Sequence, residues 1–254
     1  MNNNYISYNL NGWMPVNRNL SYEQKIRKFS AYIKETYEEP IVIMLQEMVA
    51  GNKGKFLGLL RCLFPEYELI VPAGFDYAKH YKSIMAVTLV RRDALGNYRV
   101  VELDTELPNR MCYLIADLNG HETHVINSHL VQLQNLRNQA NWYIAERKRL
   151  KNQQWGLLHD VLHKNKNANV VFAGDMQERK KADNLKKLFE DGYIVSGAAA
   201  AKTVKNSFFN VESCIDHIIL SRSQRALLGN TTEILYDNSY VGTYSDHTLL
   251  CLCS

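Results

Sequence analysis

Asn169-Val-Val-Phe-Ala-Gly-Asp-Met-Gln177 is the stretch of sequence that says most about the fold. The apolar run at residues 170–173 predicts a short buried strand that ends at Gly174. Asp175 and Gln177 follow, and side chains two residues apart in an extended backbone point to the same side. They therefore place oxygen donors at the rim of a sheet, and such donors suit a hard cation such as Mg²⁺ better than zinc. An ordinary Gly-Asp turn is the alternative interpretation.

The 254-residue chain has the composition of a folded globular protein, with 46% hydrophobic and 22% charged residues. This length suffices for one large domain or two small ones. Because we find no linker, internal repeat or low-complexity segment, we expect residues 1–254 to form a single domain. The net charge of +4 attracts polyanions only mildly, so charge alone does not indicate nucleic-acid binding.

Cysteine usage and the N-terminal residues indicate a reducing compartment. The five cysteines are odd in number and scattered, and most lie in apolar runs where we expect small buried side chains. They show no zinc-binding spacing. The sequence starts Met-Asn-Asn-Asn-Tyr, which lacks the layout of a secretory signal, and no apolar stretch approaches the roughly 18 residues of a membrane span. We therefore expect a cytoplasmic protein without a membrane span.

The hydrophobic pattern predicts both strand hairpins and strands that alternate with helices. Helices are expected at residues 21–37, 53–64, 132–163 with a break near 153–156, and 180–189. Strands are expected at residues 5–10, 41–45, 67–71, 84–90, 98–103, 111–118, 122–128, 214–220 and 248–252, with a hairpin at Asn119-Gly120 and loops at 72–82 and 191–210. A mixed sheet arrangement with flanking helices fits this pattern best.

Polar residues lie beside the ends of many of these strands, where a sandwich of sheets can gather them into one cation site. They are Asn9, Glu47, His129, Asp175, Gln177, Asp216, Asp246 and His247. Most also have a plain structural interpretation: a solvated strand end, a local turn or a hydrogen-bonded rim histidine. Asp216 differs, because a carboxylate inside an apolar strand needs a partner. His217 points to the opposite face and is expected to be structural.

The order of these motifs resembles the endonuclease/exonuclease/phosphatase superfamily, whose fold is deoxyribonuclease I-like. The motifs are Ser-Tyr-Asn-Leu-Asn-Gly (7–12), Leu-Gln-Glu (45–47), Asn-Ser-His-Leu (127–130), Gly-Asp-Met-Gln (174–177), Ile-Asp-His-Ile (215–218) and Ser-Asp-His (245–247). The resemblance implies a four-layered α/β sandwich of two packed mixed β-sheets flanked by helices, with the site at one rim. It also implies metal-dependent hydrolysis of a phosphoester.

The resemblance assigns a role to each candidate residue. Glu47 and Asn9 would hold the cation, which is Mg²⁺ or alternatively Mn²⁺, and Asp246 would assist. Asp175 would position or deprotonate the attacking water. His247, paired with Asp216, would contact the scissile phosphate, and His129 would help to protonate or stabilise the leaving oxygen.

Three further residues are expected to contact phosphate: Asn11, Arg110 and Gln177. Gln177 departs from the family pattern, which has asparagine at that place. The side chain is one methylene longer, and a misplacement near 1 Å can lower a rate on the order of a hundredfold.

The leading hypothesis is therefore a divalent-metal-dependent phosphodiesterase, specifically a nuclease acting on DNA or RNA. The basic groups at residues 91–92, 147–151 and 180–181 favour a nucleic-acid partner. Tyr77, His80 and Tyr81 can stack on bases or merely cover the core. The alternatives are hydrolysis of a smaller phosphoester (a lipid headgroup, an inositol phosphate or a protein–nucleic acid adduct) and a catalytically weakened phosphate or nucleic-acid binder. No protein partner can be read from the sequence.

Overall fold

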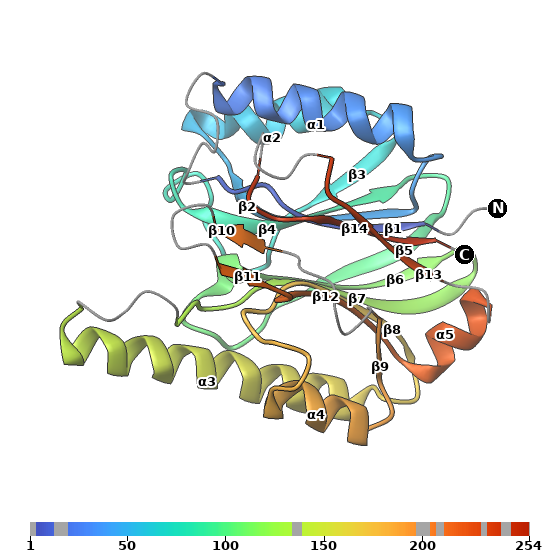
Figure 1. The fold of residues 1–254 in the computed structure, drawn as a ribbon. Coiled ribbons are helices and arrows are strands. Elements are labelled where there is room, and N and C mark those ends of the chain that lie inside the picture. Colours follow the sequence, from blue (N-terminus) through green and yellow to red (C-terminus); the bar gives the residue numbers. More distant parts are fainter. Residues whose placement is uncertain are drawn as a thin grey trace.

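The computed structural model describes residues 4–12, 20–133, 139–196, 204–206, 211–229, 233–239 and 245–253. Two six-stranded β-sheets pack face to face, and helices lie on the outer face of each sheet (Figure 1). This is the four-layered α/β sandwich of two mixed sheets that the resemblance implies. No helix in these ranges is both long and apolar enough to cross a membrane.

The first sheet has the strand order β13-β14-β1-β2-β4-β3. Its strands are β1 (Tyr5–Asn9), β2 (Val42–Val49), β3 (Tyr67–Ile70), β4 (Ile84–Arg91), β13 (Glu233–Asp237) and β14 (Leu249–Cys253). Helices α1 (Tyr22–Thr36) and α2 (Lys55–Leu63) cover its outer face (Figure 1). Helix α1 starts where the sequence predicts, because the Ser21 hydroxyl accepts from the Gln24 amide at 3.2 Å and the Gln24 side chain accepts from the Ser21 amide at 2.8 Å.

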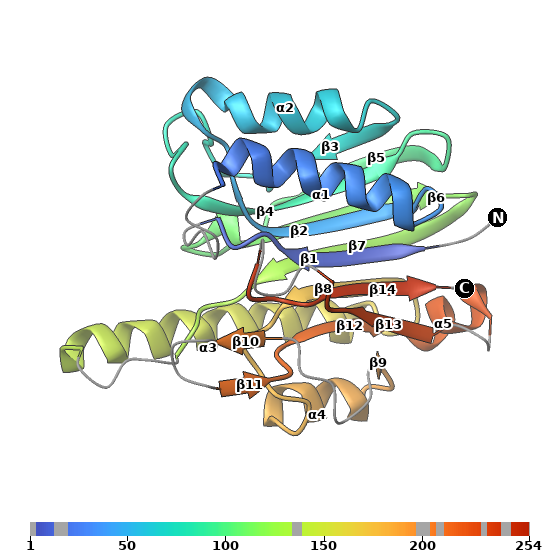
Figure 2. The ribbon, with the colours of Figure 1, turned by 45° about the horizontal axis from the view of Figure 1, so that its top comes forward.

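The second sheet has the strand order β5-β6-β7-β8-β12-β9. Its strands are β5 (Leu95–Val101), β6 (Met111–Leu118), β7 (His121–His129), β8 (Asn169–Asp175), β9 (Ile194–Ser196) and β12 (Asp216–Leu220). Helices α3 (Asn141–Lys164) and α4 (Asp183–Glu190) cover its outer face. The described elements also include two antiparallel strands, β10 (Val204–Asn206) and β11 (Val211–Ser213), helix α5 (Arg222–Leu228), and two 3₁₀ helices, η1 (Asn52–Gly54) and η2 (Pro108–Arg110) (Figure 2).

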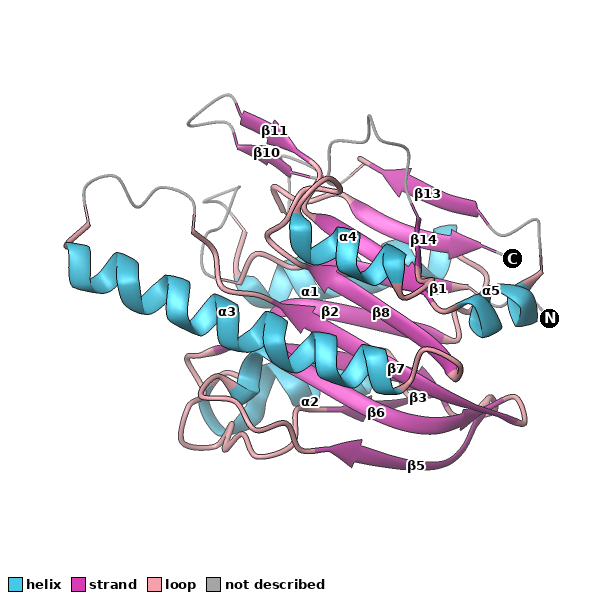
Figure 3. Cartoon of the chain, turned by 90° about the horizontal axis from the view of Figure 1, so that it is seen from below, coloured by secondary structure: helices cyan, strands magenta, loops and turns pink. Residues whose placement is uncertain are grey.

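Each sheet contains one parallel strand pair, which positions the candidate residues. β1 runs parallel to β2, and β7 runs parallel to β8; the intervening chain forms α1 in the first case and α3 in the second. Because parallel neighbours end at the same edge of a sheet, Asn9 lies across from Gln46, and His129 lies across from Asp175. Figure 3 shows the second sheet from the side of α3 and α4.

A buried polar contact ties the two sheets together beneath this edge. The Asn127 amide nitrogen in β7 donates to the Leu45 and Val87 carbonyls of the first sheet, at 3.1 and 2.9 Å. Its oxygen accepts from the Gln46 side chain at 2.8 Å. Buried hydrogen bonds of this kind favour one arrangement of a core, because a slip of one sheet against the other would break them.

The structure corrects the predicted break in the long helix. Helix α3 runs without interruption through residues 153–156. A glycine inside a helix costs about 1 kcal/mol relative to alanine, but Gly156 lies between residues that anchor the helix. Trp155 and Leu158 are buried in the core, and the Gln154 side chain accepts from the Val131 amide at 2.9 Å. The helix also starts at Asn141 rather than at residue 132; residues 134–138 lie outside the described ranges.

Other predicted boundaries also differ from the structure. Helix α4 begins at Asp183, after a turn that holds residues 180–181. The expected loop at 191–210 contains the short strands β9 and β10, although residues 197–203 and 207–210 lie outside the described part. Helix α5 and strand β13 were not predicted, because short elements give a weak periodic signal. Of the five cysteines, Cys112 and Cys251 are buried, whereas Cys62 is exposed on α2.

Candidate active site

All ten predicted site residues lie along one edge of the sandwich, and both sheets contribute. The first sheet supplies Asn9 and Asn11 after β1, Glu47 in β2, and Asp246 and His247 before β14. The second supplies Arg110 before β6, His129 at the end of β7, Asp175 and Gln177 at the end of β8, and Asp216 at the start of β12. Hydrogen bonds and short contacts connect these residues, as described below.

Strand β2 bends where it presents Glu47. The pairing of β2 with β4 slips at this point, and Glu47 has a φ of 53°. A positive φ is strained for a side chain other than glycine, and bulges of this kind redirect a side chain. The Val49 amide donates to the Tyr22 hydroxyl at 3.0 Å, which holds the bend. Gly12 passes so close that an added Cβ would lie 2.2 Å from the Glu47 carbonyl oxygen.

Strands β7 and β8 approach closely at Gly174, just before Asp175. Gly174 has a φ of 139°, and a Cβ there would lie 1.9 Å from the Ser128 carbonyl oxygen. Only glycine fits so close to a neighbouring backbone. The Gly-Asp pair in the opening stretch of the sequence is therefore part of a strand end and not an ordinary turn.

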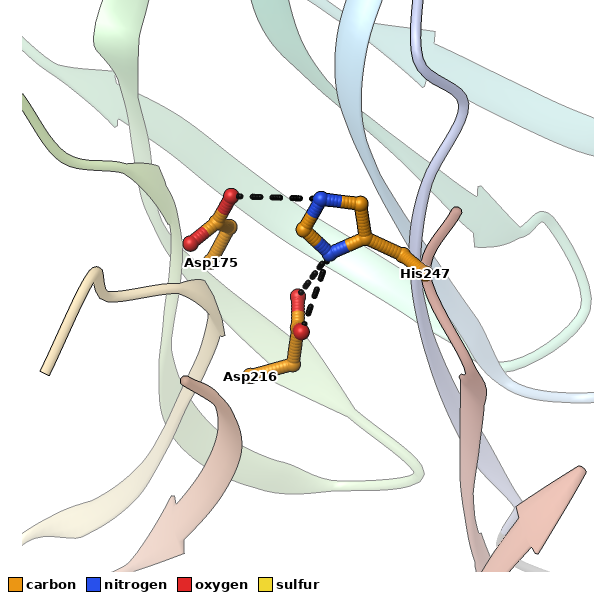
Figure 4. Close-up of side chains that lie close together, drawn as sticks. All are labelled: Asp175, Asp216 and His247. Carbon is orange, nitrogen blue, oxygen red and sulfur yellow. Dashed lines mark hydrogen bonds and ion pairs between the residues drawn. The ribbon is translucent and has the colours of Figure 1, made fainter. Parts of the chain in front are cut away.

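The centre of the site is a buried group of Asp175, Asp216 and His247 (Figure 4). The His247 Nδ1 lies 3.0 Å from each carboxylate oxygen of Asp216. Its Nε2 faces the Asp175 carboxylate at 3.8 Å. The pairing of His247 with Asp216 matches the expectation from the resemblance.

The charge of His247 is set by its carboxylate neighbours. Burial alone lowers the pKa of the imidazole, but the charges of Asp216, Asp175 and Asp246 and the hydrogen bond that Nδ1–H donates to Asp216 raise that pKa well above its ordinary value. His247 is therefore an imidazolium at neutral pH, with Nδ1–H held by Asp216 and Nε2–H directed into the site. His217 lies on the opposite face of β12, where its Nε2 contacts the Glu178 carbonyl oxygen at 2.8 Å.

Asp175 is fully buried, and its pKa is raised. Burial is the main cause, and the negative charges of Asp216 and Glu47 add to it, while His247 and the hydrogen bond from Gln177 act in the opposite direction. Its carboxylate is therefore a stronger base than that of an ordinary aspartate.

Gln177 folds back onto Asp175. Its amide nitrogen donates to both carboxylate oxygens at 2.8 Å, and its backbone has a φ of 52°. The Gln177 amide oxygen is buried and accepts no hydrogen bond from a described residue. Lys151 holds the turn from behind, since its ammonium donates to the Gln177 carbonyl oxygen at 2.8 Å. In this conformation the amide donors of Gln177 are directed at Asp175, and phosphate binding by Gln177 stays a prediction.

Asn9 links the carboxylates of the two sheets. Its amide nitrogen lies 3.1 Å from Asp175 Oδ2 and 3.4 Å from Glu47 Oε1. Its amide oxygen accepts from the Asn11 backbone amide at 2.8 Å, so Asn9 would have to rotate its amide to offer oxygen to a cation. Asn11 in turn donates from its side chain to Asp246 at 2.8 Å.

His129 and Arg110 form the other side of the site. The Arg110 guanidinium donates to His129 Nδ1 at 2.8 Å, and His129 Nε2 lies 3.4 Å from Glu47 and 3.7 Å from Asp175. Burial, and then the positive charges of Arg110, His247 and Arg147, lower the pKa of His129 well below its ordinary value. His129 is therefore neutral at neutral pH, with its proton on Nε2.

Sequence reasoning missed Lys25, which is buried in α1. Its ammonium donates to the carbonyl oxygens of Leu10 and Asn11 at 2.6 and 2.8 Å, and so fixes the segment that follows β1. Burial lowers the pKa of Lys25 to about 8, while Glu47 and Asp246 act to raise it. No local pattern indicates this role, because this lysine lies among the polar residues of an amphipathic helix.

The chemistry of the donors fits a hard divalent cation. Glu47 and Asp175 face a common point between the sheets, and Asp246 lies beside them. The ligand atoms of Asp175, Asp216 and His247 also lie within 4.8 Å of one another. Because His247 Nδ1 is already engaged with Asp216, we expect the carboxylate oxygens to be the ligands.

Two features that the sequence suggested for nucleic-acid recognition, the basic pair at 91–92 and the aromatic residues of the loop at 72–82, lie away from the site or have another role. Arg91 is at the opposite end of the strands from the site and pairs with Asp93 at 2.5 Å. Arg92 pairs with Glu68 at 2.9 Å. Tyr77 and Tyr81 pack partly against the core beneath α1 and α2, together with the other apolar side chains of that layer. The core-covering interpretation therefore fits these aromatic residues better than base stacking does.

No protein-family model matches the sequence, and no curated protein does. Solved structures match over almost the whole chain. A humanized D. rerio TDP2 is 17% identical over 99% of this chain and 98% of its own, with a TM-score of 0.69. An AP endonuclease from Archaeoglobus fulgidus is 14% identical over 98% of each chain, with a TM-score of 0.69. An endonuclease/exonuclease/phosphatase family protein from Bacteroides thetaiotaomicron is 14% identical over 100% of this chain and 97% of its own, with a TM-score of 0.63.

The chain has the deoxyribonuclease I-like fold that these solved structures share. The fold implied by the six sequence motifs is thus confirmed. Sequence identity this low carries the fold alone, so the chemistry of this deoxyribonuclease I-like protein has to be argued from its own side chains.

Proposed function

We propose that the protein is a divalent-metal-dependent phosphodiesterase that cleaves nucleic-acid phosphodiester bonds. The observation that carries the proposal is the His247–Asp216 pair, which faces the buried Asp175 carboxylate across a site built from both sheets. A cationic donor and a basic carboxylate directed at one point are what in-line attack on a phosphodiester requires.

Glu47 would hold the cation, with Asp246 and a rotated Asn9 beside it, and the oxygen-rich donors favour Mg²⁺ or Mn²⁺. When bound, the ion neutralises phosphate oxygens and so lowers the barrier to attack by a nucleophile.

Asp175 would orient the attacking water and accept its proton. Its raised pKa makes it a better proton acceptor than an ordinary aspartate, and general base catalysis of this kind contributes about 10²–10⁴-fold. The donors from Gln177 keep the carboxylate in one orientation.

His247 and His129 would act on the phosphate from two sides. His247 donates from Nε2–H to a phosphate oxygen and stabilises its developing charge. His129 is neutral, which favours hydrogen bonding to the leaving oxygen over proton donation to it. Arg110 is half-buried, with its guanidinium against His129, and would contact phosphate if that hydrogen bond opened.

Two solved structures with the same fold support a nucleic-acid substrate. One is a D. rerio TDP2 complexed with a single-strand DNA product, and the other is a 3′ phosphatase from Neisseria bound to a product DNA hairpin. The protein is 16% identical to each of them. Because identity this low carries the fold alone, action on nucleic acid in the cytoplasm is our proposal for this chain.

A panel of substrates with Mg²⁺ and EDTA arms tests the proposal. We expect hydrolysis of single- or double-stranded DNA or RNA with Mg²⁺ and its loss in EDTA, because the cation neutralises the attacked phosphate. The measurement is product formation on denaturing gels, with an inositol phosphate, a lipid phosphodiester and a small aryl phosphodiester alongside. Cleavage of only a small phosphoester would contradict the nuclease assignment.

The second candidate function is a weakened binder that keeps phosphate affinity without turnover. The observation that favours it is the Gln177 amide, which occupies both oxygens of the carboxylate that would orient water. The longer side chain would then block the base instead of supporting it.

Gln177→Asn separates these two candidates. If the protein is a working enzyme, we expect turnover within about tenfold of wild type, because asparagine also tolerates the positive φ and leaves Asp175 in place. The measurement is kcat on the best substrate of the panel. A gain of more than about a hundredfold from near zero would favour the binder.

A further inference from the structure

The first turns of α3 carry an exposed aromatic surface that the proposed chemistry does not use. We define this α3 platform as Trp142, Tyr143 and Arg147. Trp142 is 73% exposed, far more than Tyr98 at 43%, an exposed aromatic residue on β5. In Figures 2 and 3 the start of α3 extends beyond the sheets, at the end of the molecule where β10 and β11 lie.

The platform is ordered by contacts among its own residues. The Trp142 and Tyr143 rings meet edge to face, with centroids 5.9 Å apart. The Arg147 guanidinium lies 5.9 Å from the Tyr143 ring centroid, one helical turn further along. Arg147 also donates to the Gln132 carbonyl oxygen at 2.7 and 3.1 Å, so it is fixed to the segment that follows β7.

The platform continues the candidate active site. Arg147 donates to the carbonyl oxygen of Gln132, three residues after His129 at the end of β7, and this contact places the cation beside the site. Trp142 precedes Arg147 by five residues, which is about 7.5 Å along the helix axis and roughly 140° around it. Tyr143 contacts both residues, so a nucleic-acid strand whose phosphate pairs with Arg147 has to pass over Tyr143 to place a base on Trp142.

Charge on the neighbouring face of α3 indicates the path of a bound nucleic-acid strand. Arg149 binds Glu106 and Glu146 at 2.6 to 2.8 Å, so that face offers no free positive charge. Arg147 donates hydrogen bonds to the neutral Gln132 carbonyl and keeps its charge for an anion. The route from the site to Trp142 therefore runs over Arg147 and Tyr143.

We propose that the α3 platform stacks an unpaired base of a single-stranded nucleic acid whose scissile phosphate lies in the active site. This inference rests on the proposed function and specifies its substrate as single-stranded at the position that reaches Trp142. A duplex hides its base faces, whereas an unpaired base can stack on an indole ring and a phosphate can pair with the adjacent arginine.

Equilibrium binding in EDTA tests the platform without any turnover. The probes are fluorescein-labelled single strands of DNA and of RNA, each about 10 nucleotides long, and the matching duplexes. We expect Trp142→Ala to weaken single-strand binding about 5- to 100-fold, since one base stack contributes roughly 1–3 kcal/mol, and to change duplex binding far less. Trp142→Phe should restore most of the affinity, because phenylalanine keeps a π face. Whichever of DNA or RNA binds more tightly identifies the source of the strand.

Tyr98→Ala is the matched control, since Tyr98 is an exposed aromatic residue on the edge strand β5. It should leave single-strand affinity within about twofold. Equal losses on single strands and duplexes, or an unchanged affinity in Trp142→Ala, would overturn the platform while leaving hydrolysis in the substrate panel intact. Failure of the wild-type protein to bind any oligonucleotide would instead remove the nucleic-acid substrate itself, and the platform with it.

Discussion

Asp175→Asn is expected to lower kcat by about 10²–10⁴-fold on the best phosphodiester substrate, because it removes the group that accepts the proton of the attacking water. Asparagine has nearly the same shape and can still accept a hydrogen bond from Gln177, so the site should keep its geometry. The measurement is single-turnover hydrolysis with Mg²⁺ in excess. Residual activity above about a tenth of wild type would show that Asp175 is not the base.

The same substitution should raise stability in EDTA. The pKa of Asp175 is raised by folding, so its contribution to stability is fully present below the unfolded pKa and is lost as pH rises through the folded pKa. Asparagine has no such loss, and we expect a Tm higher by about 2–8 °C at pH 8 and a smaller difference near pH 5. Asp104→Asn, at an exposed position, is the control and should change neither activity nor the pH dependence of Tm. A lower Tm for Asp175→Asn at pH 8 would show that pairing with His247 outweighs the burial of the carboxylate.

The site edge could be predicted from the sequence because most of the site residues lie at or near the end of an apolar strand. Asp175 illustrates this: an apolar run, a glycine that permits close strand approach, and a carboxylate are adjacent in the chain. The resemblance added which of these strand ends meet. The pairing of Asp216 with His247 joins residues 31 positions apart, and no local pattern indicates that contact.

Other features depend on tertiary contacts that a sequence does not encode locally. Lys25 resembles its exposed neighbours in the helix, and only the position of the segment after β1 makes it a buried donor to two carbonyl groups. The roles of the residues in the basic run at 147–151 also depend on tertiary contacts. Its members face three directions: Arg147 lies beside the site, Arg149 binds two glutamates and Lys151 is buried against Glu178.

The conformation of Gln177 could not be predicted for a different reason. From the sequence, the extra methylene of Gln177 suggested that its amide contacts the phosphate from a slightly displaced position. The positive φ instead turns the side chain back to Asp175, where two hydrogen bonds to a buried carboxylate outweigh the strain of that backbone.

Asp216→Asn is expected to lower kcat at neutral pH by about 10²–10⁴-fold, through its effect on His247. Asp216 is the main group that keeps this buried imidazole charged against the effect of burial. Without that carboxylate the pKa of His247 should fall, so a neutral ring faces the phosphate at neutral pH. An amide nitrogen can also bind Nδ1 and favour the wrong tautomer.

The pH dependence separates this cause from general damage to the site. In the wild type His247 should remain protonated through neutral pH, whereas the remaining activity of Asp216→Asn should rise as pH falls and restores the imidazolium. Asp191→Asn is the matched control, because Asp191 forms the same kind of carboxylate–imidazole contact with His163, at 2.9 Å, on the surface beside α3 and α4. That variant should keep the wild-type rate and pH profile. Histidine NMR signals in EDTA give the His247 titration directly, and an unchanged His247 pKa in Asp216→Asn would mean that Asp175 and Asp246 alone hold the proton on this ring.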